Sequence, residues 1–336
     1  MDARSFAIVG AGAIGGIVGA HLIKAGHAVI FIESNADHRA AIRADGLKIS
    51  GHRDIVVHPE VFAPGEFNGL VSHLLLAVKS RDTNAALSPL SHLLADDGYV
   101  VSLQNGLEEY KIAEIVGNPR TIGAYLTFGG FYKEPGHIVY GGPGSFKVGE
   151  LDGSITPRLE DLQQALSHQQ PVQTTSNIFG YLWAKMALGA VYFGTATVDA
   201  PVLDIYADAR CRTVLGRFAG EAVAVADALK VGIENCDGFD PKAFRMTGAV
   251  DDEAVEASWK AQDTYWRSHD NTHTGVWRDL AIHKRPTEVD WQVGEIIRLA
   301  DQIGQDVPNL KTLRQIIKEI EEGARSQSWA NLQSLA

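Results

Sequence analysis

The chain has 336 residues, 45% of them hydrophobic and 21% charged, which indicates a folded globular protein of about two domains rather than a disordered chain. Its formal net charge of −11 disfavours binding to nucleic acids, whose phosphates would repel an acidic surface. Two cysteines, Cys211 and Cys236, are too few for a disulfide scaffold or a structural zinc site, and they fit a reducing cytoplasm.

The first 150 residues alternate short apolar runs with segments of helical spacing. Strands are expected at 6–9, 28–32, 74–78, 99–103 and 121–126. Helices are expected between them, at 14–25, 38–44, 83–94 and 108–116. Apolar runs of this length separated by helices are typical of a parallel sheet covered on both faces, so we predict a Rossmann-type α/β domain.

The pattern then changes and ends in helices alone. Residues 136–140 and 146–149 are expected to form antiparallel strands joined by Gly-Gly-Pro-Gly, followed by a helix at 158–168 and a strand at 172–175. Further helices are expected at 178–192, 210–230, 251–266, 288–303 and 310–322. We therefore predict a Rossmann domain over 1–176, an all-helical domain for substrate binding and dimerisation over 177–325, and a polar, fraying tail over 326–336.

A GxGxxG motif follows the first strand and opens the first helix. Gly10 permits a tight turn, Gly12 lets the backbone approach a pyrophosphate, and Gly15 lets helix and strand pack closely. Ala13 and Ile14 lie in the first helical turn, whose N–H groups would face the phosphates. The motif predicts a bound dinucleotide.

An acidic residue stands at the end of the second strand, where it can contact the cofactor's ribose. The carboxylate of Glu33 can accept hydrogen bonds from ribose hydroxyls, and it would repel the 2′-phosphate of NADP. NAD is therefore favoured over NADP. His38 and Arg39 lie a few residues further on and leave NADP open as an alternative.

Further motifs occur in a fixed order along nearly the whole chain. They are GAGAIG at 10–15, Ala77–Lys79, Ser102–Gly106, Gly136–Ile138, Gly144–Gly149, Trp183–Lys185, Arg278–Asp279, Arg285–Asp290, Gly294 and Val307–Asn309. Together they resemble the ketopantoate reductase family. The resemblance implies a Rossmann domain, a helical domain, substrate bound between them, and NADPH-dependent reduction of a 2-oxo acid to a 2-hydroxy acid.

The resemblance also implies roles for individual residues. Lys185 matches the family's catalytic lysine, Glu288 its glutamate, and Asn105 its LQNG asparagine, which also borders the cofactor. Lys79 matches a lysine near the nicotinamide. Each also has a structural interpretation: Lys185 as a side chain reaching solvent, Glu288 as favourable charge at a helix start, Asn105 as a turn residue and Lys79 as a solvated charge.

A segment of the helical domain is implied to border the substrate. Thr274 stands where the family has a serine, Arg278 stands where it has a glutamine, and Trp277 lies between them. His269, His273 and His283 lie nearby, but their spacing matches no metal motif, so no metal is expected.

Three positions depart from the family pattern. The asparagines expected four and eight residues after Lys185 are Gly189 and Phe193, on the same helix face, so two substrate-binding amides are missing. Ser34 replaces the arginine that binds the 2′-phosphate in NADP-using members. These changes predict a divergent, NAD-preferring enzyme with a bulkier or less polar substrate.

The residues themselves supply a mechanism for hydride transfer between nicotinamide and a small oxo or hydroxy compound. The Lys185 ammonium can stabilise the developing alkoxide and deliver its proton, with Glu288 orienting it. Two alternatives remain: a genuine NADPH-dependent 2-dehydropantoate 2-reductase, and a dinucleotide-binding sensor without turnover. The expected partner is a small substrate, with neither nucleic acid nor membrane, in a cytoplasmic protein for which a homodimer is the default.

Overall fold

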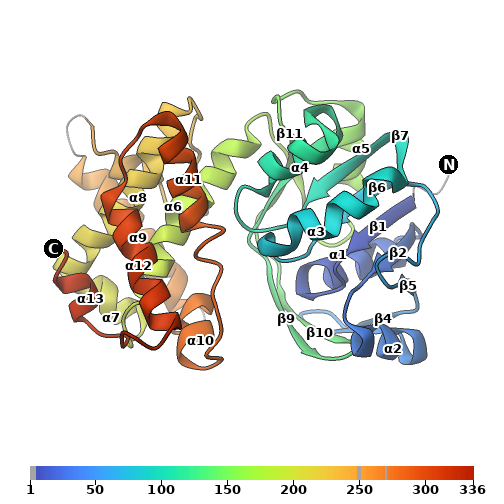
Figure 1. The fold of residues 1–336 in the computed structure, drawn as a ribbon, viewed down its shortest axis with the longest axis horizontal. Coiled ribbons are helices and arrows are strands. Elements are labelled where there is room, and N and C mark those ends of the chain that lie inside the picture. Colours follow the sequence, from blue (N-terminus) through green and yellow to red (C-terminus); the bar gives the residue numbers. More distant parts are fainter. Residues whose placement is uncertain (1–4, 248–250, 269–270) are drawn as a thin grey trace. The chain divides into compact units, whose positions relative to one another are not determined.

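A computed structural model describes residues 5–247, 251–268 and 271–336 of the chain. It contains two compact units, Met1–Ile178 and Phe179–Ala336 (Figure 1). A Rossmann-like α/β unit followed by a helical unit confirms the predicted fold class. No helix in the described ranges is both long and apolar enough to cross a membrane.

The first unit contains an eight-stranded, mostly parallel sheet with the strand order β12-β11-β8-β7-β6-β1-β2-β5. The strands in this order are Gln173–Thr174, Phe146–Glu150, Thr121–Leu126, Leu94–Ser102, Val71–Leu76, Ser5–Val9, Ala28–Ile32 and Glu60–Phe62. The β11–β8 pair is antiparallel, and every other neighbouring pair of strands in this sheet is parallel. The central strand β1 pairs with both β2 and β6. The carboxyl ends of β1, β2, β6 and β7 therefore lie at one edge of the sheet.

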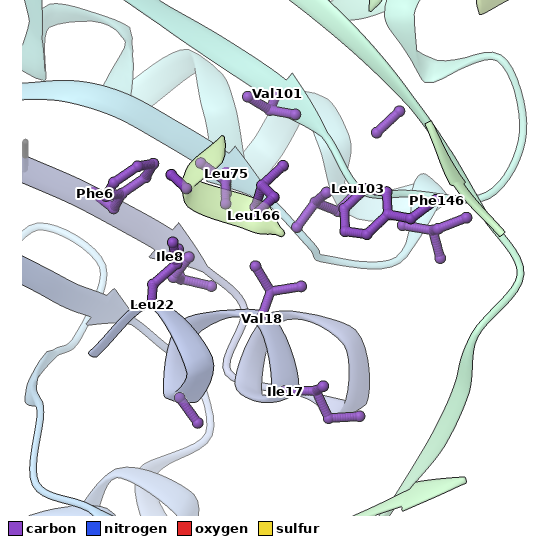
Figure 2. Packing of buried hydrophobic residues seen from close by; sticks show 14 of the residues in the cluster. Phe6, Ile8, Ile17, Val18, Leu22, Leu75, Val101, Leu103, Phe146 and Leu166 are labelled. Carbon is purple, nitrogen blue, oxygen red and sulfur yellow. The ribbon is translucent and has the colours of Figure 1, made fainter. Parts of the chain in front are cut away.

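Helices cover both faces of this sheet. Successive side chains of a strand point to opposite faces, and in the central strands both sets are apolar. Phe6 and Ile8 of β1 pack with α1 (Ala13–Lys24) and α5 (Pro157–Leu166), and Figure 2 shows Val18 of α1 near Ile8. Ala7 and Val9 face the opposite way and pack with α3 (Thr83–Leu87) and α4 (Glu108–Val116). The segment expected as one helix at 83–94 is α3 followed by a 3₁₀ segment, Ser88–Leu93, because Pro89 lacks the N–H that an α-helix needs.

A second, four-stranded sheet was not expected from the sequence. Its order is β4-β3-β10-β9, with strands at Ile55–Val57, Leu47–Gly51, His137–Gly142 and Gly129–Glu134. The predicted pairing of 136–140 with 146–149 is wrong, because β10 pairs with β3 and β9 while β11 joins the large sheet. The small sheet covers the side of α1 that faces away from the large sheet, so α1 is buried from Gly15 to Leu22.

The second unit is built from helices. They are α6 (Ile178–Thr195), α7 (Val202–Ala207), α8 (Ala209–Ala228), α9 (Asp252–Arg267), α10 (Gly275–Ala281), α11 (Val293–Ile303), α12 (Pro308–Glu321) and α13 (Ala330–Gln333). The remaining helices of the first unit are α2 (Ala36–Asp45) and short 3₁₀ turns. α11 begins five residues later than expected, since 288–292 form a turn.

The polar C-terminal segment does not fray as predicted. The side chain of Asn331 is buried and donates to the backbone oxygens of Thr197 and Ser326, both at 2.9 Å. Leu332 is fully buried, and the Gln327 amide donates to the backbone oxygen of Ala196. These polar side chains satisfy the free carbonyls after α6, so the tail is part of the helical unit.

Candidate functional site

The glycine-rich loop after β1 has the close contacts that its spacing predicts. Gly10 has a φ of +94°, and its N–H donates to the backbone oxygen of Ile32 at 2.9 Å. A Cβ on Gly15 would lie 2.1 Å from the Gly10 oxygen and 2.9 Å from the Ala77 Cβ. No side chain fits there, so Gly15 fixes how closely α1 approaches the strand ends.

The first turn of α1 is open where the rest of the helix is buried. Gly12 is its N-cap, no side chain caps the turn, and a Cβ on Gly12 would meet no atom within 4 Å. Gly12, Ala13 and Ile14 are partly exposed. The free N–H groups and the positive end of the helix dipole therefore face open space, and this fits a dinucleotide pyrophosphate.

Glu33 lies at the carboxyl end of β2, beside this loop. Its carboxylate accepts hydrogen bonds from the N–H groups of Ala11 and Asn35, both at 2.8 Å. A carboxylate has about four acceptor positions, so lone pairs remain for ribose hydroxyls. Ser34 is exposed next to it. The carboxylate thus also fixes the shape of the loop, a role that the sequence did not reveal.

His38 does not bind a 2′-phosphate, contrary to the alternative left open above. It is 1% exposed, its Nδ1 accepts from the Gly136 N–H, and its Nε2 lies 2.8 Å from the Ala11 oxygen. Because a backbone N–H can only donate, Nε2 carries the proton and donates to Ala11. His38 therefore links the glycine-rich loop to the β9–β10 turn. Arg39 donates to the Glu33 backbone oxygen at 2.7 Å.

The loops after β6 and β7 lie against each other at the same sheet edge. The Ser80 hydroxyl donates to the Asn105 backbone oxygen at 2.7 Å, and the Gln104 amide donates to the Val78 oxygen at 3.0 Å. Lys79 and Asn105 are both exposed on these adjoining loops. The first unit thus brings together every residue predicted to bind the cofactor.

Helix α6 exposes one narrow stripe. Between residues 181 and 195 only Tyr181, Lys185, Gly189 and Tyr192 are partly exposed, at spacings of four, four and three, and all others are buried. These spacings place the four on one helix face. Lys185 is the only charged residue of α6, and it lies on this stripe while the other faces of the helix are buried.

The stripe continues to Tyr192 rather than to Phe193. Phe193 is 1% exposed, and this burial argues against the expectation that its ring contacts substrate. The Tyr192 hydroxyl donates to the Gln262 side-chain oxygen at 2.9 Å, and the Trp266 ring lies edge-on at 5.6 Å. Burial raises the pKa of Tyr192 well above its usual value, so the hydroxyl stays neutral. Sequence reasoning missed this tyrosine.

Glu288 lies in the turn before α11, between two anchored neighbours. Thr287 donates to Glu321 from its N–H and its hydroxyl, both at 2.7 Å. Asp290 pairs with Arg314 at 2.7 Å and with Lys318 at 3.2 Å. Two attachments to α12 therefore fix the turn that carries the partly exposed Glu288.

The predicted pocket segment begins at the start of α10. Thr274 is the N-cap of this helix, 4% exposed, and accepts from the Trp277 N–H at 3.1 Å, so its hydroxyl serves the helix. The half-buried Trp277 ring stacks near His273 with centroids 3.9 Å apart. Arg278 is exposed and contacts the Asn271 side chain.

Among the residues that the structure describes, no three histidine, cysteine or acidic side chains lie together as a metal site would require. His269 lies outside the described residues. The residues predicted to bind the cofactor belong to the first unit, and Lys185, Glu288 and the residues predicted to contact substrate belong to the second.

Two family descriptions match most of the sequence. "Ketopantoate reductase PanE/ApbA" matches residues 6–153, and "Ketopantoate reductase PanE/ApbA C terminal" matches residues 177–321. The 2-dehydropantoate 2-reductase of Archaeoglobus fulgidus is 28% identical over 324 residues, which cover 96% of this chain and 100% of the relative. The enzyme of the same name from Pyrococcus horikoshii is 27% identical, covering 90% and 92%.

Solved structures share the fold over the same length. A PanE/ApbA family ketopantoate reductase from Ralstonia eutropha aligns with a TM-score of 0.78 at 26% identity, covering 95% of this chain and 99% of that one. D-mandelate dehydrogenase with NADH and anilino(oxo)acetate aligns with a TM-score of 0.81, covering 96% and 100%. At 20% identity this second similarity shows the fold alone.

Proposed function

Because the chain belongs to the ketopantoate reductase family of NAD(P)-dependent oxidoreductases, we propose that it interconverts a small 2-oxo acid and its 2-hydroxy acid, with NAD(H) as cofactor and a substrate other than ketopantoate. The observation that carries the proposal is the stripe on α6. The stripe presents one cation, Lys185, while the other faces of the helix are buried in apolar packing.

Lys185 and Glu288 have the chemistry that carbonyl reduction requires. The nicotinamide, when bound, supplies the hydride. The Lys185 ammonium stabilises the negative charge that develops on the carbonyl oxygen, and it transfers a proton to that oxygen to give the hydroxyl. Glu288 orients the ammonium. In the oxidation direction, neutral Lys185 accepts the proton.

The residues beside Lys185 support a substrate bulkier than ketopantoate. Gly189 has no side chain one turn after Lys185, and Tyr192 presents an aromatic ring at the end of the stripe. Initial rates with ketopantoate, 4-methyl-2-oxopentanoate, phenylpyruvate and benzoylformate test this proposal. We expect kcat/KM for one of the larger acids to exceed that for ketopantoate at least tenfold, because an unfilled pocket loses contacts.

The second candidate is a genuine ketopantoate reductase. The names of the curated relatives favour it, since they match over at least nine-tenths of both chains. Rapid NADPH-dependent turnover of ketopantoate above all other acids would establish this candidate. The same result would refute the argument from Gly189 and Tyr192.

Cofactor preference tests the interpretation of Glu33. We expect NADH to bind at least tenfold more tightly than NADPH, because the carboxylate at the end of β2 would repel the 2′-phosphate. Glu33→Gln should shift the NADH-to-NADPH ratio of dissociation constants toward NADPH, although both affinities fall because the N–H of Ala11 or that of Asn35 loses its acceptor. Fluorescence titration of both cofactors measures the ratio.

The matched control is Asp37→Asn, which removes an exposed carboxylate from the first turn of α2. It should leave the ratio within twofold of the wild type. Tighter binding of NADPH by the wild type would show that Arg39, rather than Glu33, decides the preference.

A further inference from the structure

Gln292 is a side chain that neither the family motifs nor the spacing of the sequence singled out. It is the N-cap residue of α11, and its N–H donates to the Glu288 oxygen at 3.0 Å. Gln292 therefore lies one turn beyond Glu288. Its Oε1 lies 3.2 Å from the position that a Cβ on Gly189 would occupy.

This contact sets the register between α6 and the turn before α11. Lys185 and Gly189 are one helical turn apart, as are Glu288 and Gln292. The Gln292 carboxamide borders the open position beside Gly189, about 6 Å along the helix axis from Lys185. A side chain at position 189 would have to displace it.

The carboxamide has no hydrogen-bond partner among the described residues, and the residue is partly exposed. With Oε1 directed at Gly189, the two hydrogens on Nε2 are left for a ligand. Two other glutamine amides in this unit are used by the fold: Gln262 accepts from Tyr192, and Gln327 donates to a backbone oxygen. A partly exposed amide that has no partner in the described part of the chain is hydrated, and a ligand carboxylate beside Lys185 can replace that water at little cost.

We propose that the Gln292 carboxamide binds the carboxylate of the 2-oxo acid while Lys185 binds its carbonyl oxygen. The inference rests on the proposed function and specifies how that site recognises its substrate. The carbonyl and carboxylate oxygens of a 2-oxo acid are about 3 Å apart. With a hydrogen bond of about 2.9 Å from each of these two oxygens, the acid can bridge the Lys185 ammonium and an amide that lies one helical turn away. Because the amide is neutral, it can donate a hydrogen bond to the carboxylate without placing a second positive charge beside Lys185.

Two variants of Gln292 test this assignment with the 2-oxo acid that the wild type reduces best and with its methyl ester. Gln292→Leu should lower kcat/KM for the acid at least tenfold, mainly through KM, because one charge-assisted hydrogen bond is lost. Gln292→Glu should lower it at least a hundredfold, since two carboxylates would face each other. For the uncharged ester, Gln292→Glu should change kcat/KM less than threefold relative to the wild type.

Two further variants separate binding from folding. Gly189→Ala pushes a methyl group against the carboxamide and should raise KM for the acid, while the Tm stays equal or rises because alanine favours the helix. Gln302→Leu makes the same substitution at an exposed position of α11 and should change neither kcat nor KM. NADH affinity should be unchanged in all variants.

The outcomes distinguish this inference from the proposed function. If the wild type reduces no 2-oxo acid, the proposed function fails and this inference fails with it. If the wild type reduces one and Gln292→Leu remains within twofold in kcat/KM, only this inference fails. Equal losses for acid and ester in Gln292→Glu would also overturn it, because they would indicate a structural role.

Discussion

Replacing Lys185 with methionine should lower kcat by about three orders of magnitude while the dissociation constant for NADH stays within twofold of the wild type. In the proposed mechanism the ammonium is both the proton donor and the stabiliser of the alkoxide, and each role would contribute about 10²-fold or more. Methionine preserves the volume and apolar packing of a helix that is buried on its other faces. Steady-state rates and NADH fluorescence titration measure the two quantities.

Two other lysine variants make this test specific. Lys260→Met replaces an exposed lysine on α9 and should leave kcat unchanged. Lys185→Arg keeps the charge, yet arginine does not deprotonate near neutral pH, so oxidation of the hydroxy acid should remain slow. Near-normal turnover by Lys185→Met would mean that the lysine only reaches solvent, and the mechanism would be wrong.

Gly12→Val should abolish measurable NADH binding, with at least a hundredfold loss of affinity, while the free energy of unfolding changes by less than about 1 kcal/mol. The Gly12 Cβ position is empty to 4 Å, so the fold accommodates a side chain there. That side chain would occupy the space over the first turn of α1 where the pyrophosphate approaches. Titration calorimetry with NADH and urea unfolding measure the two effects.

The matched variant is Gly15→Ala, three residues along the same motif. Its Cβ would lie 2.1 Å from the Gly10 oxygen and 2.9 Å from the Ile8 Cγ2, so α1 must move away from the sheet. Overpacking against backbone should cost about 3 kcal/mol of stability. Equal stability of the two variants, or NADH binding by Gly12→Val, would contradict the roles assigned to the two glycines.

The sequence predicted the elements whose apolar pattern is local. The β1 strand, the GxGxxG turn and α1 form one continuous signal, and the structure places them within one or two residues of the expected bounds. Short strands such as β4 (Ile55–Val57) and β5 (Glu60–Phe62) have three residues each, too few for a period-two pattern to appear. The β10–β11 pairing failed because a glycine-rich connection fits both a hairpin and a crossover between sheets.

Roles that depend on a distant partner could not be predicted. His38 forms its two ring hydrogen bonds with Ala11 and Gly136, which are 27 and 98 residues away. Phe193 and Tyr192 lie on adjacent helix positions, and only the packing around α6 decides which of them is buried. Gln292 acquires its significance from Gly189, more than a hundred residues earlier in the chain.

The sequence by itself determined the Rossmann-like unit, the helical unit and the position of Lys185 on an apolar helix. The signals for these features are the periodicity of strands and helices and the spacing of glycines, and each depends only on residues close together in the chain. Only the tertiary structure decided which face of α6 is open, that His38 and Glu33 hold the glycine-rich loop, and that an unused amide lies over Gly189. These features are contacts between elements far apart in the chain. Burial and hydrogen bonding there depend on how the elements pack, and no single segment contains that information.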